Sequence, residues 1–308
     1  MRAVAKYGLL RIFEREHILN IDTHAMEASG LKNTWVKYIL KSVLFCVVFT
    51  CFLVVFSFVK SFVPNNFERL AHGILGTLAA FVTTVVFLKF DRKQFSDIGL
   101  IFERKTIVRF FSGVVVGIGI MGLLATSVLC FSHVTVEVNP NGNILHFLLV
   151  TFPLIPLAFM EELGFRAYPL EILKDKIGIR MSIVTTSILF ALYHIANGWT
   201  IASSFYGPAV WGLIFGLAAI YSKGIAMPTG IHYAANLTTS AFGAANNAVS
   251  IWIVKPANNI AAKDGGVDWS TILPSLALLI FAIVCLELYI RRKTTANSVL
   301  GKAGLTEE

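Results

Sequence analysis

The sequence predicts an all-α integral membrane protein, a bundle of about eight transmembrane helices with a polar cavity inside the membrane. The 308-residue chain has a mean hydropathy of +0.72, and only 14% of its residues are charged. This composition is too apolar for a soluble domain of similar length. Uncharged runs of about 20 residues recur along the chain, which is the length that a helix needs to cross the hydrocarbon core.

We expect three segments. Residues 1–36 form a cytoplasmic leader, which the pattern allows to be either an amphipathic helix on the membrane surface or a simple basic tail. This region has no early apolar core followed by a small-residue cleavage site, so it does not resemble a signal peptide. Residues 37–290 form a single eight-helix membrane domain, and residues 291–308 form a cytoplasmic tail.

The eight expected spans are separated by charged or turn-forming segments. Lysines and an aspartate at 174–176 end the fourth span, and Gly198 with Gly207-Pro208 divides a long uncharged stretch into the fifth and sixth. Glycines at 113, 117, 119 and 122 in the third span allow close helix packing. The expected spans are 37–59, 70–88, 110–133, 144–173, 181–197, 205–222, 225–254 and 269–290.

The distribution of basic residues predicts the orientation. With eight spans, 21 of the 26 lysines and arginines fall on the side of the two termini, and four fall on the other side. Cytoplasmic loops carry the excess of positive charge, so both termini are expected in the cytoplasm of a multi-pass protein, at the plasma membrane in a bacterium. The net charge of +8 then reflects topology and anionic lipid rather than nucleic-acid binding.

A pair of glutamates marks the centre of the expected function. Glu161 and Glu162 follow an uncharged run of apolar residues, and Arg166 comes one helical turn after Glu162. Ionisable groups at membrane depth are costly and are therefore functional candidates. Helical spacing places Arg166 over Glu162, which leaves Glu161 as the carboxylate that can act as a base.

Further polar residues occur on two other expected spans. His194 lies late in the fifth span, and His232 and Asn236 lie one turn apart in the seventh. Polar groups in a membrane should face the bundle interior. We therefore expect Glu161, His194, His232 and Asn236 to converge on one cavity, which the nearby basic loop 174–180 would place toward the cytoplasmic side.

These residue types suit amide hydrolysis. A glutamate beside a histidine can deprotonate water, while a second histidine and an asparagine can donate hydrogen bonds to an oxyanion. Glu161, His194 and His232 could instead hold a divalent ion such as zinc with an open position for water, so no cofactor is certain. The sequence lacks His-Glu-x-x-His and Gly-x-Ser-x-Gly, and all six aspartates fall in expected loops or the tail.

Three motifs occur in order: Glu161-Glu162-x-x-x-Arg166, Phe190-x-x-x-His194 and His232-x-x-x-Asn236. Together they resemble the CPBP family of intramembrane proteases, which comprises the type II CAAX prenyl endopeptidases and the bacteriocin-processing and self-immunity (Abi) proteins. The motif core covers 144–250. The family is often called a metalloprotease family, although a metal-free glutamate mechanism suits these residues equally well.

The resemblance implies an intramembrane endopeptidase. Glu161 would be the general base with His194 assisting, His232 and Asn236 would stabilise the tetrahedral intermediate, and Glu162 with Arg166 would be the supporting ion pair. The implied partners are membrane lipid and a peptide or lipidated protein. The alternative is a membrane protein without enzymatic activity: an immunity or scaffold protein, or a proton-coupled transporter that uses the Glu/His cluster.

Overall fold

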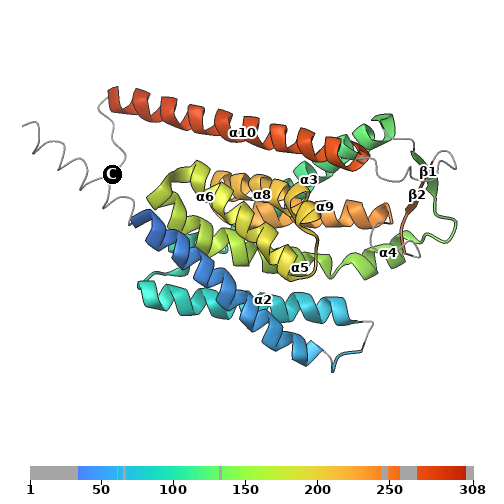
Figure 1. Cartoon of the computed structure of the whole chain (residues 1–308), viewed down its shortest axis with the longest axis horizontal. Helices are drawn as coiled ribbons and strands as arrows, with labels where there is room; N and C mark the ends of the chain where they lie inside the picture. Colours follow the sequence, from blue (N-terminus) through green and yellow to red (C-terminus); the bar gives the residue numbers. More distant parts are fainter. Residues whose placement is uncertain are drawn as a thin grey trace, which may run out of the picture.

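The computed structural model describes residues 34–60, 62–64, 67–131, 134–243, 249–256 and 269–302. The leader expected at 1–36 lies outside these residues up to position 33, so its amphipathic character stays a prediction. The described chain is a bundle of long helices that run roughly along one axis (Figure 1).

Six helices are long and apolar enough to cross a membrane, which supports the expected all-α membrane fold. The count of about eight is not confirmed. The stretch Ile144–Ala196 has 53 residues and is counted as one span, although it contains a sharp bend. The helix Ala226–Ala241, which contains His232, has only 16 residues and is too short to be counted as a span. The six spans are Thr34–Lys60, Glu68–Asp91, Arg104–Cys130, Ile144–Ala196, Ile201–Ser222 and Ile272–Ala296.

The elements follow the chain in a simple order after the Thr34–Lys60 helix. The labelled elements are α2 (Glu68–Asp91), η2 (Phe95–Ile98), α3 (Arg104–Phe131), β1 (Val134–Val138), α4 (Ile144–Thr151), α5 (Leu154–Glu162), η3 (Leu163–Ala167), α6 (Tyr168–Ala196), α7 (Ile201–Tyr206), α8 (Pro208–Ser222), α9 (Ala226–Ala241), β2 (Trp252–Pro256) and α10 (Trp269–Lys302).

The bend lies within α6, at Gly178, whose φ of 78° belongs to the left-handed region that favours glycine. The rings of Phe165 and Phe190 are 5.1 Å apart. Phe165 and Phe190 are 25 positions apart in the sequence, and in a straight helix they would lie about 37 Å from each other. The chain therefore folds back at Gly178, which brings the glutamate motif on one arm beside the Phe190 motif on the other.

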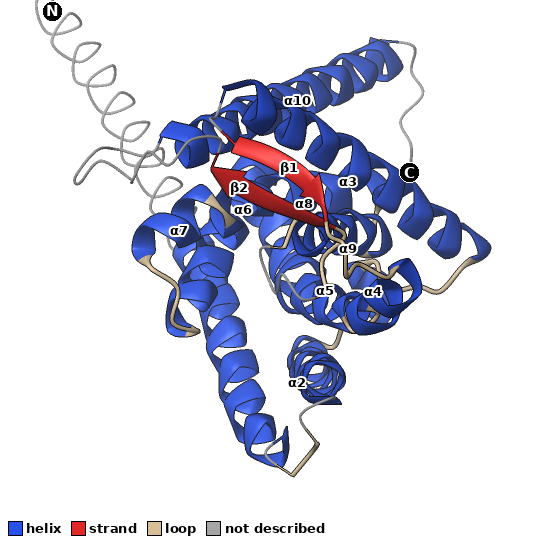
Figure 2. Ribbon diagram, turned by 90° about the vertical axis from the view of Figure 1, so that its right-hand side faces the viewer, coloured by secondary structure: helices blue, strands red, loops and turns tan. Residues whose placement is uncertain are grey.

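Two expected spans are shorter than the sequence suggested. The third was expected to continue to 133, but α3 ends at Phe131 and β1 follows; the seventh was expected to continue to 254, but α9 ends at Ala241 and β2 follows. The strands pair antiparallel, with Val138 opposite Trp252. Valine recurs at every second position of β1, which favours a strand. In the sequence, the apolar run of the preceding helix obscured this two-residue period. Figure 2 shows the pair lying across one end of the bundle.

Glycine contacts hold α3 against α9. A Cβ atom at Gly113 would lie 2.1 Å from the carbonyl oxygen of Met227, and one at Gly230 would lie 2.1 Å from that of Phe110. The two backbones therefore approach as closely as small residues allow in a membrane helix pair. The expectation of close packing is thus confirmed for the first half of α3. At Gly119 and Gly122 a Cβ atom would meet nothing within 4 Å.

Candidate active site

The glutamate motif lies where an α-helix changes into a π-turn. Helix α5 ends at Glu162, and η3, a π-helical turn, contains Arg166. Such wide turns are frequent at functional sites. Arg166 Nε lies 3.5 Å from Glu162 Oε2, and both side chains are fully buried. The structure thus places the ion pair where the helical spacing predicted it.

Aromatic rings enclose the guanidinium of Arg166. Its central carbon lies 4.2 Å from the ring centroid of Phe190 and 5.3 Å from that of Phe215. Within the described part of the chain, the guanidinium nitrogens have no hydrogen-bond partner. The charge is therefore balanced by the carboxylate and by cation–π contacts, which strengthen when the cation is desolvated.

His232 joins the two glutamates. Its Nδ1 lies 2.8 Å from Glu162 Oε1, and its Nε2 lies 3.5 Å from Glu161 Oε2. The imidazole also stacks on the Phe215 ring, at 4.5 Å between centroids and 16° between planes. The bond to a buried carboxylate and the stacked ring fix the orientation of this histidine. The sequence had not indicated that His232 shares Glu162 with Arg166.

The two glutamates differ in exposure. The side chain of Glu161 is 16% exposed, whereas that of Glu162 is 0% exposed and is already in contact with Arg166 and His232. A carboxylate that takes a proton from water must be reachable by water. Of the two, Glu161 meets this requirement.

His194 is near this group but does not contact the glutamates. Its Nδ1 donates to the carbonyl oxygen of Phe190 at 2.9 Å, which leaves Nε2 for a substrate or water. The rings of His194 and His232 lie 4.6 Å and 6.1 Å from that of Phe190, so the two histidines flank one aromatic side chain. Among the described residues, no hydrogen bond or ion pair joins His194 to Glu161 or Glu162.

Asn236 follows His232 by one turn of α9 and is half-buried. In the part of the chain that the structure describes, no hydrogen bond joins its amide to Glu161, His194 or His232. Only its spacing of one helical turn from His232 connects Asn236 with the site, and its expected role stays a prediction.

Two further residues belong to the surroundings of the site. Trp199, in the loop between α6 and α7, packs edge-on against His194 with centroids 5.0 Å apart. His72, in α2, interacts electrostatically with Glu161. Neither residue belongs to the three sequence motifs. A histidine in an apolar span was a signal for His72, whereas nothing in the sequence connected Trp199 with His194.

The residues as placed do not fit the three-ligand zinc site that Glu161, His194 and His232 were expected to form as an alternative. Among the described residues, no group of three or more His, Cys, Asp or Glu side chains is arranged to hold a metal ion. We derive no chemical step through a metal.

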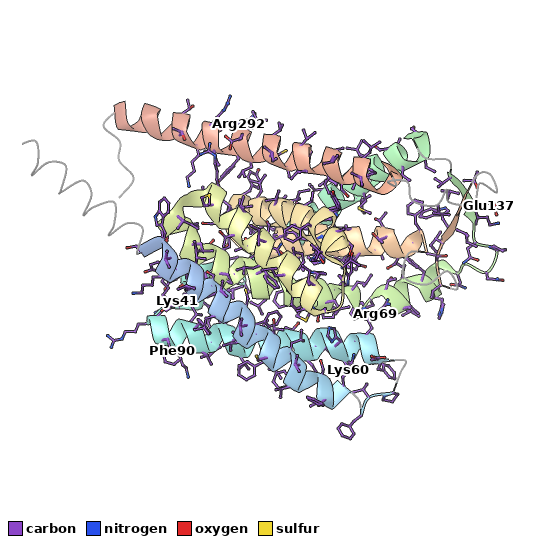
Figure 3. All side chains as sticks on the ribbon, viewed as in Figure 1. Lys41, Lys60, Arg69, Phe90, Glu137 and Arg292 are labelled. Atoms are coloured by element: carbon purple, nitrogen blue, oxygen red, sulfur yellow. The ribbon has the colours of Figure 1, made fainter. Side chains whose placement is uncertain are left out.

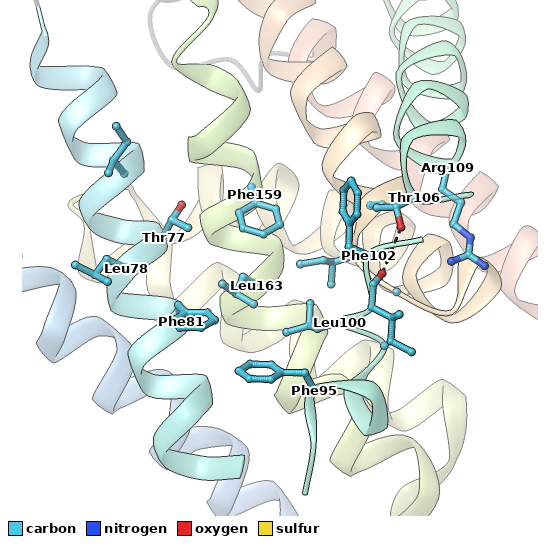
Figure 4. Close-up of a pocket in the computed structure, with 16 residues that line it drawn as sticks. Thr77, Leu78, Phe81, Phe95, Leu100, Phe102, Thr106, Arg109, Phe159 and Leu163 are labelled. Carbon is cyan, nitrogen blue, oxygen red and sulfur yellow. Dashed lines mark hydrogen bonds between the residues drawn. The ribbon is translucent and has the colours of Figure 1, made fainter. Parts of the chain in front are cut away.

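A mostly apolar cavity of about 560 Å³ lies beside the glutamate motif. Phe159 and Leu163 of the α5–η3 segment form one side of it, and Leu78 and Phe81 of α2 form another (Figure 4). Phe102 and Arg109 lie on the opposite side. Neither glutamate lines this cavity, so it is a neighbour of the candidate site rather than the site itself.

Residues 141–238, about a third of the chain, match a family model described as Rce1-like, the type II CAAX prenyl endopeptidase Rce1-like family. A comparison with curated proteins finds no match to the chain. The matched segment contains all seven residues named in the three motifs. The match shows an Rce1-like domain at residues 141–238, and with the three motifs in order it supports a CPBP family protease.

Proposed function

We propose that this protein is an intramembrane endopeptidase that hydrolyses a peptide bond with water activated by Glu161. The Rce1-like domain supports a membrane peptidase of the CAAX type at the family level. The observation that carries the finer proposal is the position of His232 between Glu161, which water can reach, and Glu162, which is fully buried. Glu162 holds the ring at Nδ1, and Glu161 faces Nε2.

In the proposed reaction, Glu161 accepts a proton from a water molecule. The water oxygen attacks the carbonyl carbon of the scissile bond, and a tetrahedral oxyanion forms. The same proton then passes to the leaving amide nitrogen as the carbon–nitrogen bond breaks. A general base placed in this way contributes roughly 10²–10⁴-fold to the rate.

His232 and Asn236 are the proposed donors to the oxyanion. They project from one face of α9, one turn apart, so both can reach a single oxygen. Glu162 and Arg166 act through His232, because they fix the ring and do not reach the reacting atoms. His194 assists at the opposite side of Phe190, with Nε2 as the proposed contact to the water or the leaving group.

The neighbouring cavity supports a lipidated protein or an apolar peptide as substrate. Its volume lies within the range of small-molecule sites, roughly 300–1,000 Å³, and its lining is mostly aromatic and aliphatic. An isoprenoid or acyl chain would suit such a lining. A prenylated peptide and the same peptide without its lipid, tested side by side, distinguish a lipid requirement from plain peptide recognition.

The function is tested with purified protein and a peptide library, comparing wild type with Glu161→Ala. We expect cleavage by the wild type and none by the variant. Cleavage that persists in the variant would contradict the role of Glu161. The absence of cleavage of every library and prenylated peptide by a folded wild type would favour the immunity, scaffold or transporter alternative.

A further inference from the structure

A second cavity, of about 470 Å³, adjoins the apolar cavity beside the glutamate motif. We call it the charged cavity. Three residues line both cavities: Gly99, Ile101 and Arg109. A Cβ atom at Gly224 would lie 2.7 Å from the carbonyl oxygen of Gly99, so the loop before α3 and the turn before α9 touch through their backbones here. The two cavities therefore meet at one junction, and the side chain of Arg109 lies at it.

The charged cavity lies at one end of the bundle, where Lys293 of α10 contributes to its lining. In Figure 3, the neighbouring Arg292 and also Lys41 lie toward this end, whereas Glu137 lies at the opposite end. We call the first the basic end. By the positive-inside rule, we expect the basic end to face the cytoplasm.

The apolar cavity extends from the basic end into the bundle. Arg109, at its junction with the charged cavity, is about 7.5 Å along α3 from the first residue, Arg104, at 1.5 Å per residue. Ile74, which also lines the apolar cavity, is about 25 Å along α2 from the last residue, Asp91, which pairs with Lys41. One part of the cavity is therefore near the membrane interface, and another is at the depth of the hydrocarbon core.

Arg109 is available to a ligand. Of the described residues that line the apolar cavity, Arg109 alone is charged. The other polar side chains in this lining are used, since the Thr77 and Thr106 hydroxyls donate to the backbone carbonyls of Gly73 and Ile101. The guanidinium of Arg109 is half-buried, and among the described residues no hydrogen bond or ion pair engages it. Its fork of N–H donors matches the geometry of a phosphate.

The charged cavity has no net charge, because four basic and four acidic side chains line it. Lys174 pairs with Glu171. Among the described residues, no ion pair joins the carboxylate of Glu103 or of Asp175, or either of the other two lysines, to a partner. Charges of both signs are therefore available, which complements a ligand that carries both a negative and a positive group.

We propose that the two cavities together bind one phospholipid of the cytoplasmic leaflet, with a headgroup that contains a phosphate and a primary ammonium. One acyl chain lies in the apolar cavity, the phosphate contacts Arg109, and the ammonium lies between the carboxylates of Glu103 and Asp175. Neither Glu161 nor Glu162 lines either cavity, so the site does not depend on the proposed peptidase function. The lipid chain of a substrate would need the same apolar space, which makes the phospholipid a competitor of a lipidated substrate.

Lipid binding to the full chain, delipidated in detergent, is measured by native mass spectrometry. The probes are phosphatidylethanolamine, phosphatidylglycerol, which has no ammonium, and phosphatidylcholine, whose ammonium has no N–H, all with the same acyl chains. We expect one phosphatidylethanolamine per protein, bound about fivefold more tightly than the other two, as for one additional hydrogen bond. Arg109→Gln should weaken binding by about 10–100-fold, because it removes hydrogen bonds between two charged groups. Arg104→Gln, at an exposed position of the same helix that lines neither cavity, is the matched control.

Wild-type affinity in Arg109→Gln, or tighter binding of phosphatidylglycerol than of phosphatidylethanolamine, would overturn the inference. If Arg109→Gln does not fold, Leu78→Trp tests the same site, because it fills the apolar cavity (Figure 4) and should abolish lipid binding. Wild-type binding by Leu78→Trp would likewise overturn the inference.

A competition experiment adds a prenylated peptide to the lipid-bound protein, and we expect it to displace the phospholipid, whereas the same peptide without its lipid should not. A prenylated peptide that binds where no phospholipid does would assign the cavities to the substrate alone and overturn the inference. Lipid binding as expected without any peptide cleavage would reject the peptidase function and keep the lipid site. Cleavage without lipid binding would do the opposite.

Discussion

His232 Nδ1 lies 2.8 Å from Glu162 Oε1, and the other oxygen of the same carboxylate lies 3.5 Å from Arg166 Nε. One buried carboxylate therefore supports both the charge of Arg166 and the orientation of the histidine that faces Glu161. Such indirect support is common behind the histidines of metal sites, where its loss typically costs about 10–100-fold in activity. This arrangement separates the expected effects of changing each glutamate.

The first prediction concerns the base. Glu161→Gln keeps the shape of the side chain and removes its basicity, so we expect peptide cleavage to fall by roughly 10²–10⁴-fold. The thermal unfolding midpoint should stay close to wild type, because Glu161 is partly exposed and not paired with Arg166. Glu137→Gln, at an exposed ion pair on β1, is the matched control and should change neither property. Full activity of Glu161→Gln would show that another residue is the base.

The second prediction concerns the buried pair. Glu162→Gln leaves the charge of Arg166 buried without its counter-ion, which should lower the free energy of unfolding by about 3–5 kcal/mol. The double variant Glu162→Gln with Arg166→Gln removes the stranded charge and should recover part of this loss. Unfolding in detergent, followed by circular dichroism, measures both. A fully stable Glu162→Gln would mean that the carboxylate does not balance Arg166.

The third prediction uses the glycines of α3. Gly113→Ala places a methyl group against the backbone of α9, and the resulting overpacking should cost about 1–3 kcal/mol. Gly119→Ala has open space and should be neutral or slightly stabilising, because alanine favours the helix. Gly230→Ala should in addition reduce activity, since it moves the backbone two residues before His232. Equal stability of Gly113→Ala and Gly119→Ala would contradict the close α3–α9 contact.

The fourth prediction concerns Trp199, which packs against His194. Trp199→Ala removes the ring that packs on His194, a contact worth about 0.5–1.5 kcal/mol. If this contact positions His194, kcat/KM should fall by roughly 2–10-fold, and Trp199→Phe should restore most of it. Trp252→Ala, which loses a stacked contact with Phe242 at the strand pair, is the control for a general effect. A loss of activity as large with Trp252→Ala as with Trp199→Ala would remove the specific role.

The fifth prediction concerns metal. Because no three His, Cys, Asp or Glu side chains among the described residues are arranged to hold a metal ion, we expect that a chelator leaves peptide cleavage unchanged and that elemental analysis finds no stoichiometric zinc. The measurement pairs both assays on the same preparation. Stoichiometric zinc, with activity lost on its removal and restored on its return, would make the two histidines ligands.

Some properties followed from the chain alone. Hydropathy and length determined that this is a helical membrane protein, because unpaired backbone groups cannot be left in lipid. The i, i+4 spacing of Glu162 and Arg166 determined their ion pair, since one turn of helix brings such residues together. The three motifs also pointed to the Rce1-like domain that the family model matches, because they place rare polar residues at fixed positions on apolar helices.

Other properties depended on contacts between distant segments. The fold-back at Gly178 places Phe190 over Arg166, and the packing of α9 on α3 brings His232 to both glutamates. The pairing of β1 with β2 joins residues more than a hundred positions apart. Local periodicity reports which face of a helix is apolar, whereas the depth and neighbours of a side chain are decided only when all helices pack together.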